Sequence, residues 1–144
     1  MHVSGLLDAK GSDVITVAPD DRVSLVAAVL AEHRIGAVVV SGDARGIDGV
    51  VSERDIVRAL ADRGATALDE PVSAIMTSEV FTCEPSTTIE QLMGLMTERR
   101  IRHVPVVVDG AFVGIVSIGD VVKDRMRDLE TETQVLHEYI AGGR

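Results

Sequence analysis

The sequence predicts a mixed α/β (α+β) fold made of two copies of one β-α-β-β-α unit, followed by a C-terminal helix. Three observations predict it: an internal repeat, apolar residues at helical spacing in each copy, and short β-branched runs typical of strands. Residues 14–19 (VITVAP) align with 80–85 (VFTCEP) at an offset of 66. Residues 49–55 (GVVSERD) align with 114–120 (GIVSIGD) at an offset of 65. The Gly, Ser and Asp coincide, so one unit is repeated over most of the chain.

The first two elements have the same order in both copies. A short strand ends at Pro19 in the first copy and at Pro85 in the second. A helix follows, because apolar residues recur at i, i+3, i+4 and i+7. These residues are Val23, Val26, Ala27 and Leu30 in the first copy and Ile89, Leu92, Met93 and Met96 in the second.

Two strands come next in each copy. Apolar runs predict them at 37–41 and 47–51, and again at 104–108 and 112–117, and their composition suggests burial on both faces. In the second copy Asp109-Gly110 lies between the runs, and an Asp-Gly pair predicts a tight hairpin turn.

A second helix is expected to begin at Ser52 and at Ser117. Residues 61–79 connect the copies, and Pro71 predicts a short helix that starts there. Residues 121–140 contain no Gly or Pro and predict a long final helix. We therefore divide the chain into a first repeat (1–66), a second repeat (67–128) and a C-terminal helical tail (129–144).

Composition narrows the classes of function. The chain has 144 residues and a net charge of −9, so attraction to nucleic acid or to anionic lipid is expected to be weak. Its apolar runs are shorter than the ~18 residues of a membrane span, and residues 1–8 lack the pattern of a secretory signal. The lone Cys83 cannot form an internal disulfide, and no Cys/His set has zinc-ligand spacing. We expect a cytoplasmic protein without nucleic acid, membrane or metal as a partner.

These motifs resemble a tandem pair of cystathionine-β-synthase-type (CBS) domains. The resemblance is carried by the two Gly-hydrophobic-hydrophobic-Ser-x-x-Asp segments, the two hydrophobic-Thr-x-x-Pro starts and residues 101–107 (IRHVPVV). Residues 10–14 and the end of the repeat near Asp120 resemble small standalone members of the family. The resemblance implies two repeats packed about a pseudo-twofold axis into one module, with two related clefts that bind adenine nucleotides.

The segment from Ser52 to Asp55 supports two interpretations. A Ser before a helix and an acid three residues later form a capping box, which stabilises the helix and binds nothing. The same arrangement points backbone N–H groups outward, where an anion could bind, and leaves a carboxylate for ribose hydroxyls. The resemblance favours the second interpretation, because the family typically holds ribose with this Asp.

Arg102 and His103 lie in the basic segment 99–103, which stands out in an acidic chain. A cation and a titratable donor suit a phosphate, so we expect both to contact one, although their position does not show in which cleft. Arg99 and Arg100 are expected to be solvent-exposed residues at a helix end. Gly119 lies at the position equivalent to Arg54, so the second helix start lacks a basic side chain. We therefore expect the two clefts to be unequal.

The resemblance and the residue chemistry together give the candidate ligand-binding residues. They are Thr16, Ile35, Gly36, Ala37, Val51, Ser52, Arg54, Asp55, Thr82, Ile101, Arg102, His103, Pro105, Val116, Ser117 and Asp120.

We expect a non-catalytic regulatory sensor of adenine nucleotides. AMP is the first candidate ligand, followed by NAD(H), ATP and S-adenosylmethionine, and the downstream protein partner is not encoded in this sequence. An alternative is a dimerisation and partner-docking module with empty clefts; a more distant one is a nucleotide hydrolase. We also predict a homodimer, with the final helix packed on the partner's module or folded back on its own domain. Its apolar stripe is interrupted at Glu130, Glu132 and Thr133, which argues against a long coiled coil.

Overall fold

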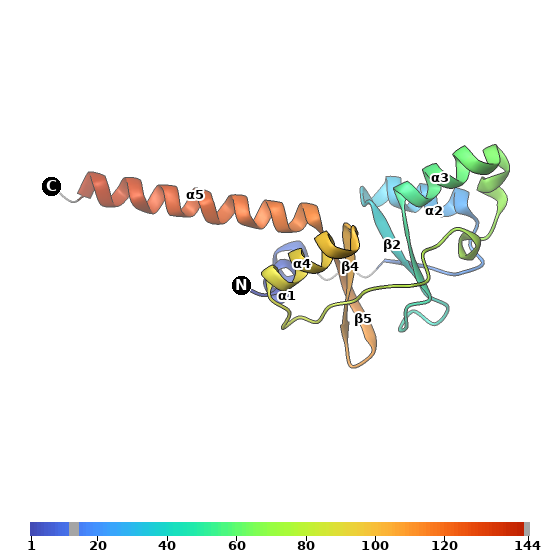
Figure 1. Ribbon diagram of the computed structural model, residues 1–144, viewed down its shortest axis with the longest axis horizontal. Coiled ribbons are helices and arrows are strands. Elements are labelled where there is room, and N and C mark those ends of the chain that lie inside the picture. The colour runs from blue at the N-terminus through green and yellow to red at the C-terminus, as the bar shows by residue number, and fades with distance from the viewer. Residues whose placement is uncertain (12–14, 143–144) are drawn as a thin grey trace.

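The computed structural model describes residues 1–11 and 15–142 (Figure 1). The first repeat contains a three-stranded sheet and two helices. Its elements are β1 (Thr16–Val17), α2 (Val23–His33), β2 (Ala37–Val40), β3 (Gly49–Ser52) and α3 (Glu53–Arg63). The strand order is β1-β2-β3, with β1 parallel and β3 antiparallel to β2. The predicted order of elements is confirmed, while Val14, the expected start of the first strand, lies outside the described residues.

The second repeat differs from the first at its first strand. Its elements are α4 (Ile89–Arg99), β4 (His103–Val108), β5 (Ala111–Ser117) and α5 (Ile118–Gly142). The strand expected at 80–85 is reduced to one bridge, in which Cys83 N–H donates to Pro105 O (3.0 Å) and Val107 N–H donates to Cys83 O (2.9 Å). The reason is the path of the chain: Thr77 pairs with Val50 of the first repeat, so the segment crosses between the sheets and only Cys83 lies alongside β4.

The Asp-Gly turn of the second repeat and the segment that connects the repeats have the structures that the sequence predicts. Asp109 and Gly110 have φ of 51° and 78°, the left-handed conformation that an Asp-Gly hairpin requires. The short helix after Pro71 is present as the 3-10 helix η2 (Val72–Ala74), and a further 3-10 helix, η1 (Gly64–Asp69), precedes it.

An N-terminal helix, α1 (Val3–Lys10), was not predicted. It lacks a side-chain cap and contains Gly5, so the sequence gives little local signal for it. Val3 and Leu6 are buried and pack in the core of the second repeat, with Leu92, Val104 and Val116. Ser4 N–H also donates to Pro85 O (2.9 Å). Although we grouped residues 1–11 with the first repeat, α1 packs on the second.

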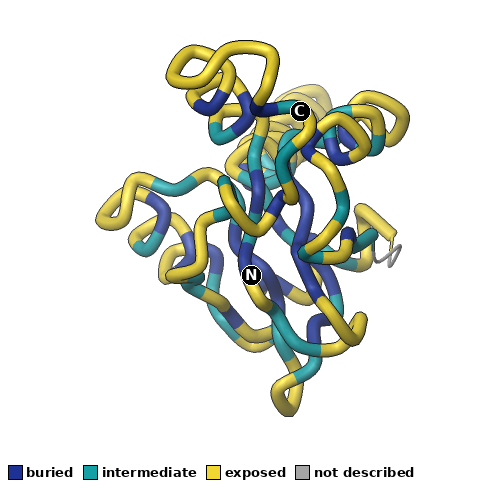
Figure 2. The backbone as a smooth tube through the Cα atoms, turned by 90° about the vertical axis from the view of Figure 1, so that its right-hand side faces the viewer, coloured by how far each residue is buried: buried dark blue, intermediate teal, exposed yellow. Residues whose placement is uncertain are grey.

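Each repeat has its own apolar core. The buried segments, dark blue in Figure 2, run through the interior of the molecule. One core is centred on Val38, Val40 and Val51, and the other on Leu92, Val104 and Val116. In Figure 1 the long helix α5 extends away from both. Val121 is buried in the second core, whereas the side chains from Leu129 to Gly142 are exposed. The predicted boundary between 128 and 129 lies inside this continuous helix.

Candidate functional site

The two Ser-x-x-Asp segments form equivalent helix starts. Ser52 caps α3, where its N–H donates to Asp55 Oδ2 (2.8 Å) and its Oγ accepts from Asp55 N–H (3.3 Å). Ser117 and Asp120 repeat this pattern at the start of α5, with distances of 2.8 and 3.2 Å. The capping-box geometry is therefore present in both repeats.

Further hydrogen bonds limit the anion site that we expected at these helix starts. Glu53 N–H donates to Gly36 O (2.9 Å), and at the equivalent place Ile118 N–H donates to Arg102 O (2.8 Å). Asp55 N–H is already bonded to Ser52 Oγ. The expectation of three outward-facing N–H groups is therefore wrong, because side-chain capping and the neighbouring segment satisfy two of them.

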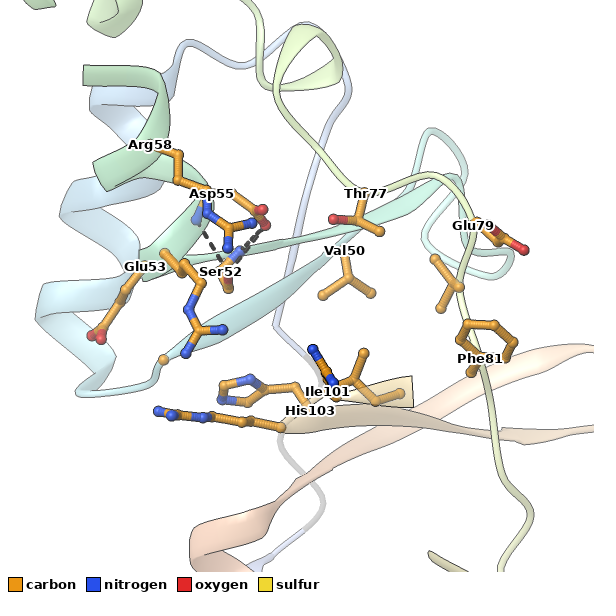
Figure 3. Close-up of a pocket in the computed structure, with 15 residues that line it drawn as sticks. Val50, Ser52, Glu53, Asp55, Arg58, Thr77, Glu79, Phe81, Ile101 and His103 are labelled. Carbon is orange, nitrogen blue, oxygen red and sulfur yellow. Dashed lines mark hydrogen bonds between the residues drawn. The ribbon is translucent and has the colours of Figure 1, made fainter. Parts of the chain in front are cut away.

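A cavity of about 280 Å³ lies between the start of α3 and the start of β4 (Figure 3). We call it the Asp55 cavity. It brings together seven of the predicted site residues from both repeats. They are Gly36, Ser52, Arg54, Asp55, Ile101, Arg102 and His103. Arg102 and His103 line the cavity that contains Asp55.

Eight lining residues of the Asp55 cavity were not among our candidates. They are Val50, Glu53, Arg58, Thr77, Glu79, Val80, Phe81 and Arg100. Four of them, residues 77 and 79–81, belong to the segment that crosses between the repeats. Their sequence carries no binding motif, so only the tertiary fold places them here. The helical spacing of Arg54 and Arg58 was an available signal, because residues four apart share one face of a helix.

Charged groups of both signs line the cavity, since Glu53 and Glu79 accompany Asp55. Four arginines line it, Arg54 and Arg58 from the first repeat and Arg100 and Arg102 from the second. Asp55 uses Oδ2 for its bonds to both Ser52 N–H and Ser52 Oγ. Its other oxygen, Oδ1, is thereby left for a ligand. The cavity offers both an acceptor for hydroxyl groups and a cationic environment for an anion.

The basic residues Arg99 and Arg100 are exposed at the end of α4, as we expected, and each has a further contact. Arg100 lines the cavity and has φ of 55°, which ends α4 as the equivalent Arg34 ends α2. Arg99 lies over the ring of Phe81, with its guanidinium carbon 4.6 Å from the ring centroid. This cation–π contact holds an aromatic wall of the cavity in place. Arg100 is therefore exposed, as we expected, and in addition lines the cavity.

His103 joins the two repeats inside the cavity. A Cβ atom at Gly36 would lie 3.0 Å from His103 Nε2, so the small residue at 36 leaves room for the imidazole. Burial lowers the pKa of His103 below its ordinary value, and the ammonium of Lys10 lowers it further. Both effects disfavour the charged imidazolium in the ligand-free protein.

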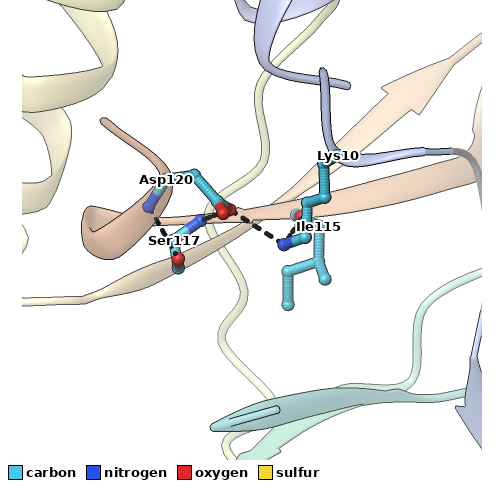
Figure 4. A network of polar contacts seen from close by, with 4 residues as sticks. All are labelled: Lys10, Ile115, Ser117 and Asp120. Atoms are coloured by element: carbon cyan, nitrogen blue, oxygen red, sulfur yellow. Dashed lines mark hydrogen bonds and ion pairs between the residues drawn. The ribbon is translucent and has the colours of Figure 1, made fainter. Parts of the chain in front are cut away.

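The equivalent carboxylate in the second repeat has a different environment. Lys10 Nζ donates to Asp120 Oδ2 (2.8 Å) and to Ile115 O (2.9 Å), as Figure 4 shows. Burial raises the pKa of Asp120, but the bonds from Lys10 and from Ser117 outweigh it, and the pKa is lowered overall. The two Ser-x-x-Asp helix starts thus differ, because α1 places an ammonium group beside Asp120.

The remaining predicted residues lie outside the Asp55 cavity. Ala37, Val51, Pro105 and Val116 are buried in the strands, whereas Thr82 is exposed beside Cys83. Ser117 and Asp120 form the second helix start. Thr16 and Ile35 are half-buried in the first repeat.

A family model for the CBS domain matches residues 8–62 and 72–127. The chain therefore belongs to the CBS-domain family and carries two CBS domains in tandem, an arrangement that acts as a regulatory module. This confirms the resemblance and the fold that we inferred from the repeated motifs.

Several known proteins are similar over most of the chain. The CBS domain-containing protein CBSX3, mitochondrial, of Arabidopsis thaliana is 35% identical over 98% of this chain and 72% of its own length. The crystal structure of the CBS-domain containing protein ATU1752 from Agrobacterium tumefaciens is 48% identical, with a TM-score of 0.83 over 87% of this chain and 99% of that one. The CBS domain pair of MJ0100, solved in complex with 5′-methylthioadenosine and S-adenosyl-L-methionine, is 25% identical, with a TM-score of 0.77 over 85% of this chain and 98% of that one.

Two properties of the described residues bear on other classes of function. Among residues 1–11 and 15–142, no helix is both long enough and apolar enough to span a bilayer. The same part of the chain holds no cluster of three or more His, Cys, Asp or Glu side chains placed to bind a metal.

Proposed function

We propose that the protein is a non-catalytic sensor that binds an adenine nucleotide, AMP first, in the Asp55 cavity. One observation carries the proposal: a single cavity combines the Asp55 carboxylate with four arginines from both repeats. A nucleotide needs both features, an acceptor for the ribose hydroxyls and cations for the phosphate. The volume of about 280 Å³ is close to the lower end of the range for small-molecule sites, which is roughly 300 Å³.

The lining suggests an orientation for the ligand. Asp55 Oδ1 accepts from the ribose hydroxyls, and Arg102 and His103 bind the phosphate. Val50, Ile101 and the ring of Phe81 provide apolar surface for the base. The adenosyl ligands in the MJ0100 structure support an adenosyl compound, and NAD(H), ATP and S-adenosylmethionine remain further candidates.

We further propose that each chain has two nucleotide sites and that the site at Asp55 fills before the site at Asp120. Asp120 is the repeat-equivalent of Asp55, but its Oδ2 is occupied by Lys10. Among the described residues, Oδ1 accepts no hydrogen bond in either Asp, but a ribose at Asp120 must share the carboxylate with the ammonium of Lys10. The unequal clefts therefore follow from Lys10 as well as from Gly119.

Two other functions compete with this proposal. A dimerisation and docking module would leave the Asp55 cavity empty, and its four arginines would have no ligand to bind. A nucleotide hydrolase needs an activated nucleophile; burial and then Glu84 raise the pKa of Cys83 to about 11, which disfavours its thiolate. Both observations favour the sensor.

The oligomeric state of the protein and its downstream partner are also part of the proposal. We propose a homodimer that passes nucleotide binding on to a downstream protein, because the module leaves apolar side chains such as Leu25 and Val57 exposed on its helices. A cytoplasmic location stays a prediction from the sequence.

Native mass spectrometry of the purified protein, followed by calorimetry, tests the proposed function. We expect a co-purified adenosyl compound, or binding of added AMP with a stoichiometry near one per chain. The Asp55→Ala protein is the matched variant, and Asp62→Ala, on the exposed surface of α3, is its control. Absence of binding by AMP, NAD(H), ATP and S-adenosylmethionine to the folded wild type would instead support the docking module.

A further inference from the structure

Helix α5 carries an apolar stripe that its own chain leaves uncovered. Its five large members are 50–64% exposed: Val122, Met126, Leu129, Leu136 and Ile140. Beyond its first turns the helix extends into solvent, away from both cores (Figure 1). The possibility that it folds back on its own domain is therefore excluded, and something else must cover the stripe.

The stripe has the spacing of a coiled-coil seam. Its residues are separated alternately by four and three positions once Thr133 is included, which is the a/d pattern of a heptad. Met126, Thr133 and Ile140 occupy a positions, and Val122, Leu129 and Leu136 occupy d positions. Glu130 and Glu132 lie at the e and g positions beside the seam and do not interrupt it.

The residue types in the seam favour two parallel strands. Thr133 and Ile140 at a are β-branched, and Leu129 and Leu136 occupy d, a combination that favours parallel dimers. Thr133 is the one polar residue of the seam. In a parallel, in-register pair it faces Thr133 of the second copy, so their hydroxyl groups can bond to each other; in an antiparallel pair it faces Leu129.

The charges beside the seam also distinguish the two directions. In a parallel pair each g residue faces the e residue five positions further along the other chain, so Arg125 meets Glu130, which has the opposite charge, and Glu132 meets His137, which can donate a hydrogen bond to it. In an antiparallel pair centred on the same seam, Glu130 faces Glu130 of the second copy, and Glu132 faces Glu132 of the second copy. The parallel arrangement gains attraction where the antiparallel one has repulsion.

We propose that α5 pairs with α5 of a second copy as a parallel two-stranded coiled coil over residues 122–140. This rests on the homodimer proposed above but is independent of nucleotide binding. It replaces our expectation that the helix packs on the partner's module. The two modules then lie side by side at the N-terminal end of the coil.

Analytical ultracentrifugation of three full-length proteins tests the pairing. The wild type is expected to be a dimer at micromolar concentration, and Leu129→Glu/Leu136→Glu is expected to be at least tenfold weaker in dimerisation. Val135→Glu is the control, because Val135 is equally exposed (58%) but lies outside the seam. A monomeric wild type overturns both the dimer and the coil. A dimer unaffected by the seam variant overturns the coil alone.

A cysteine at the end of the seam tests the direction. Ile140→Cys should give a disulfide-linked dimer under mild oxidation, because the two introduced cysteines meet in a parallel coil. In the antiparallel pair they lie about 27 Å apart along the axis and do not react. The wild type is the control, since its Cys83 is buried. Failure of Ile140→Cys to cross-link in a dimeric protein overturns the parallel arrangement.

Discussion

Lys10 Nζ and Asp120 Oδ2 lie 2.8 Å apart although 110 residues separate them in the chain. Their side chains are 33% and 23% exposed, so the pair is only partly screened by solvent. Because Asp120 corresponds to Asp55 in the other repeat, this contact makes two otherwise equivalent helix starts chemically different.

Lys10→Ala is expected to raise the stoichiometry of AMP from about one to about two per chain. Removal of the ammonium frees Asp120 for a second ribose, and calorimetry at increasing AMP concentration measures the change. Lys123→Ala, which removes an exposed ammonium from α5, should leave the stoichiometry at one. Two equal sites in the wild type would contradict the role given to Lys10.

Asp55→Ala is expected to weaken AMP binding at least tenfold. The substitution removes charge-assisted hydrogen bonds, each worth about 1.5–3 kcal/mol, and about 1.4 kcal/mol corresponds to tenfold in affinity. It also removes the Asp55 half of the capping box, a hydrogen bond worth about 0.5–1.5 kcal/mol of unfolding free energy, so urea denaturation is measured in parallel. Unchanged affinity would leave Asp55 as a capping residue alone.

Arg102→Ala is expected to abolish most of the preference for AMP over adenosine. The wild type should bind AMP more tightly, because the phosphate meets Arg102 and neighbouring cations that adenosine cannot use. Arg127→Ala, an exposed position on α5, is the control. Equal affinities of the wild type for AMP and adenosine would remove the phosphate role.

The stability of the ligand-free protein is expected to fall as the pH drops below about 6.5, the ordinary pKa of histidine. The pKa of His103 is lowered in the folded state, so the unfolded chain binds the proton first and protons favour unfolding. Denaturation midpoints from pH 8 to pH 5 should show this fall, and His103→Gln should reduce it. The other histidines, present in both proteins, cancel in the comparison.

Gly49→Ala is expected to destabilise the fold by about 1–3 kcal/mol. A Cβ atom there would lie 2.6 Å from Met76 Sδ and 2.8 Å from Thr77 O, and Thr77 O is fixed by its bond from Val50 N–H. Gly94→Ala on the exposed face of α4 meets nothing within 4 Å and should stabilise by about 0.5–1 kcal/mol. Urea denaturation of both proteins gives the comparison; equal effects would contradict the close approach at Gly49.

The features that the sequence predicted are those with a local physical cause. Ser52 and Asp55 lie within one helix start, and the repeat places the same pattern at Ser117, so both could be identified without knowing the packing. The hairpin at Asp109-Gly110 likewise depends on adjacent residues. His103 was a candidate for its chemistry and its position before a buried strand, and it lies in the Asp55 cavity; its contact with a phosphate stays a prediction.

The features that were missed depend on contacts between distant segments. Thr77 and Phe81 line the cavity only because their segment pairs with Val50 and then crosses to β4. The reduced strand at Cys83 has the same origin, since a strand's length depends on its neighbours as well as on its own residues. The sequence around Lys10 gave no indication of its ion pair with Asp120, because this contact forms only when α1 packs on the second repeat.

The position of α1 also has a consequence for how the chain folds during synthesis. Its buried residues Val3 and Leu6 belong to a core completed by Val116 and Val121, which are synthesised more than a hundred residues later. At roughly 5–20 residues per second, the helix leaves the ribosome several seconds before that core exists. The first repeat, with its own core, can fold in the meantime. A segment that is made before the first repeat is therefore among the last to reach its native place.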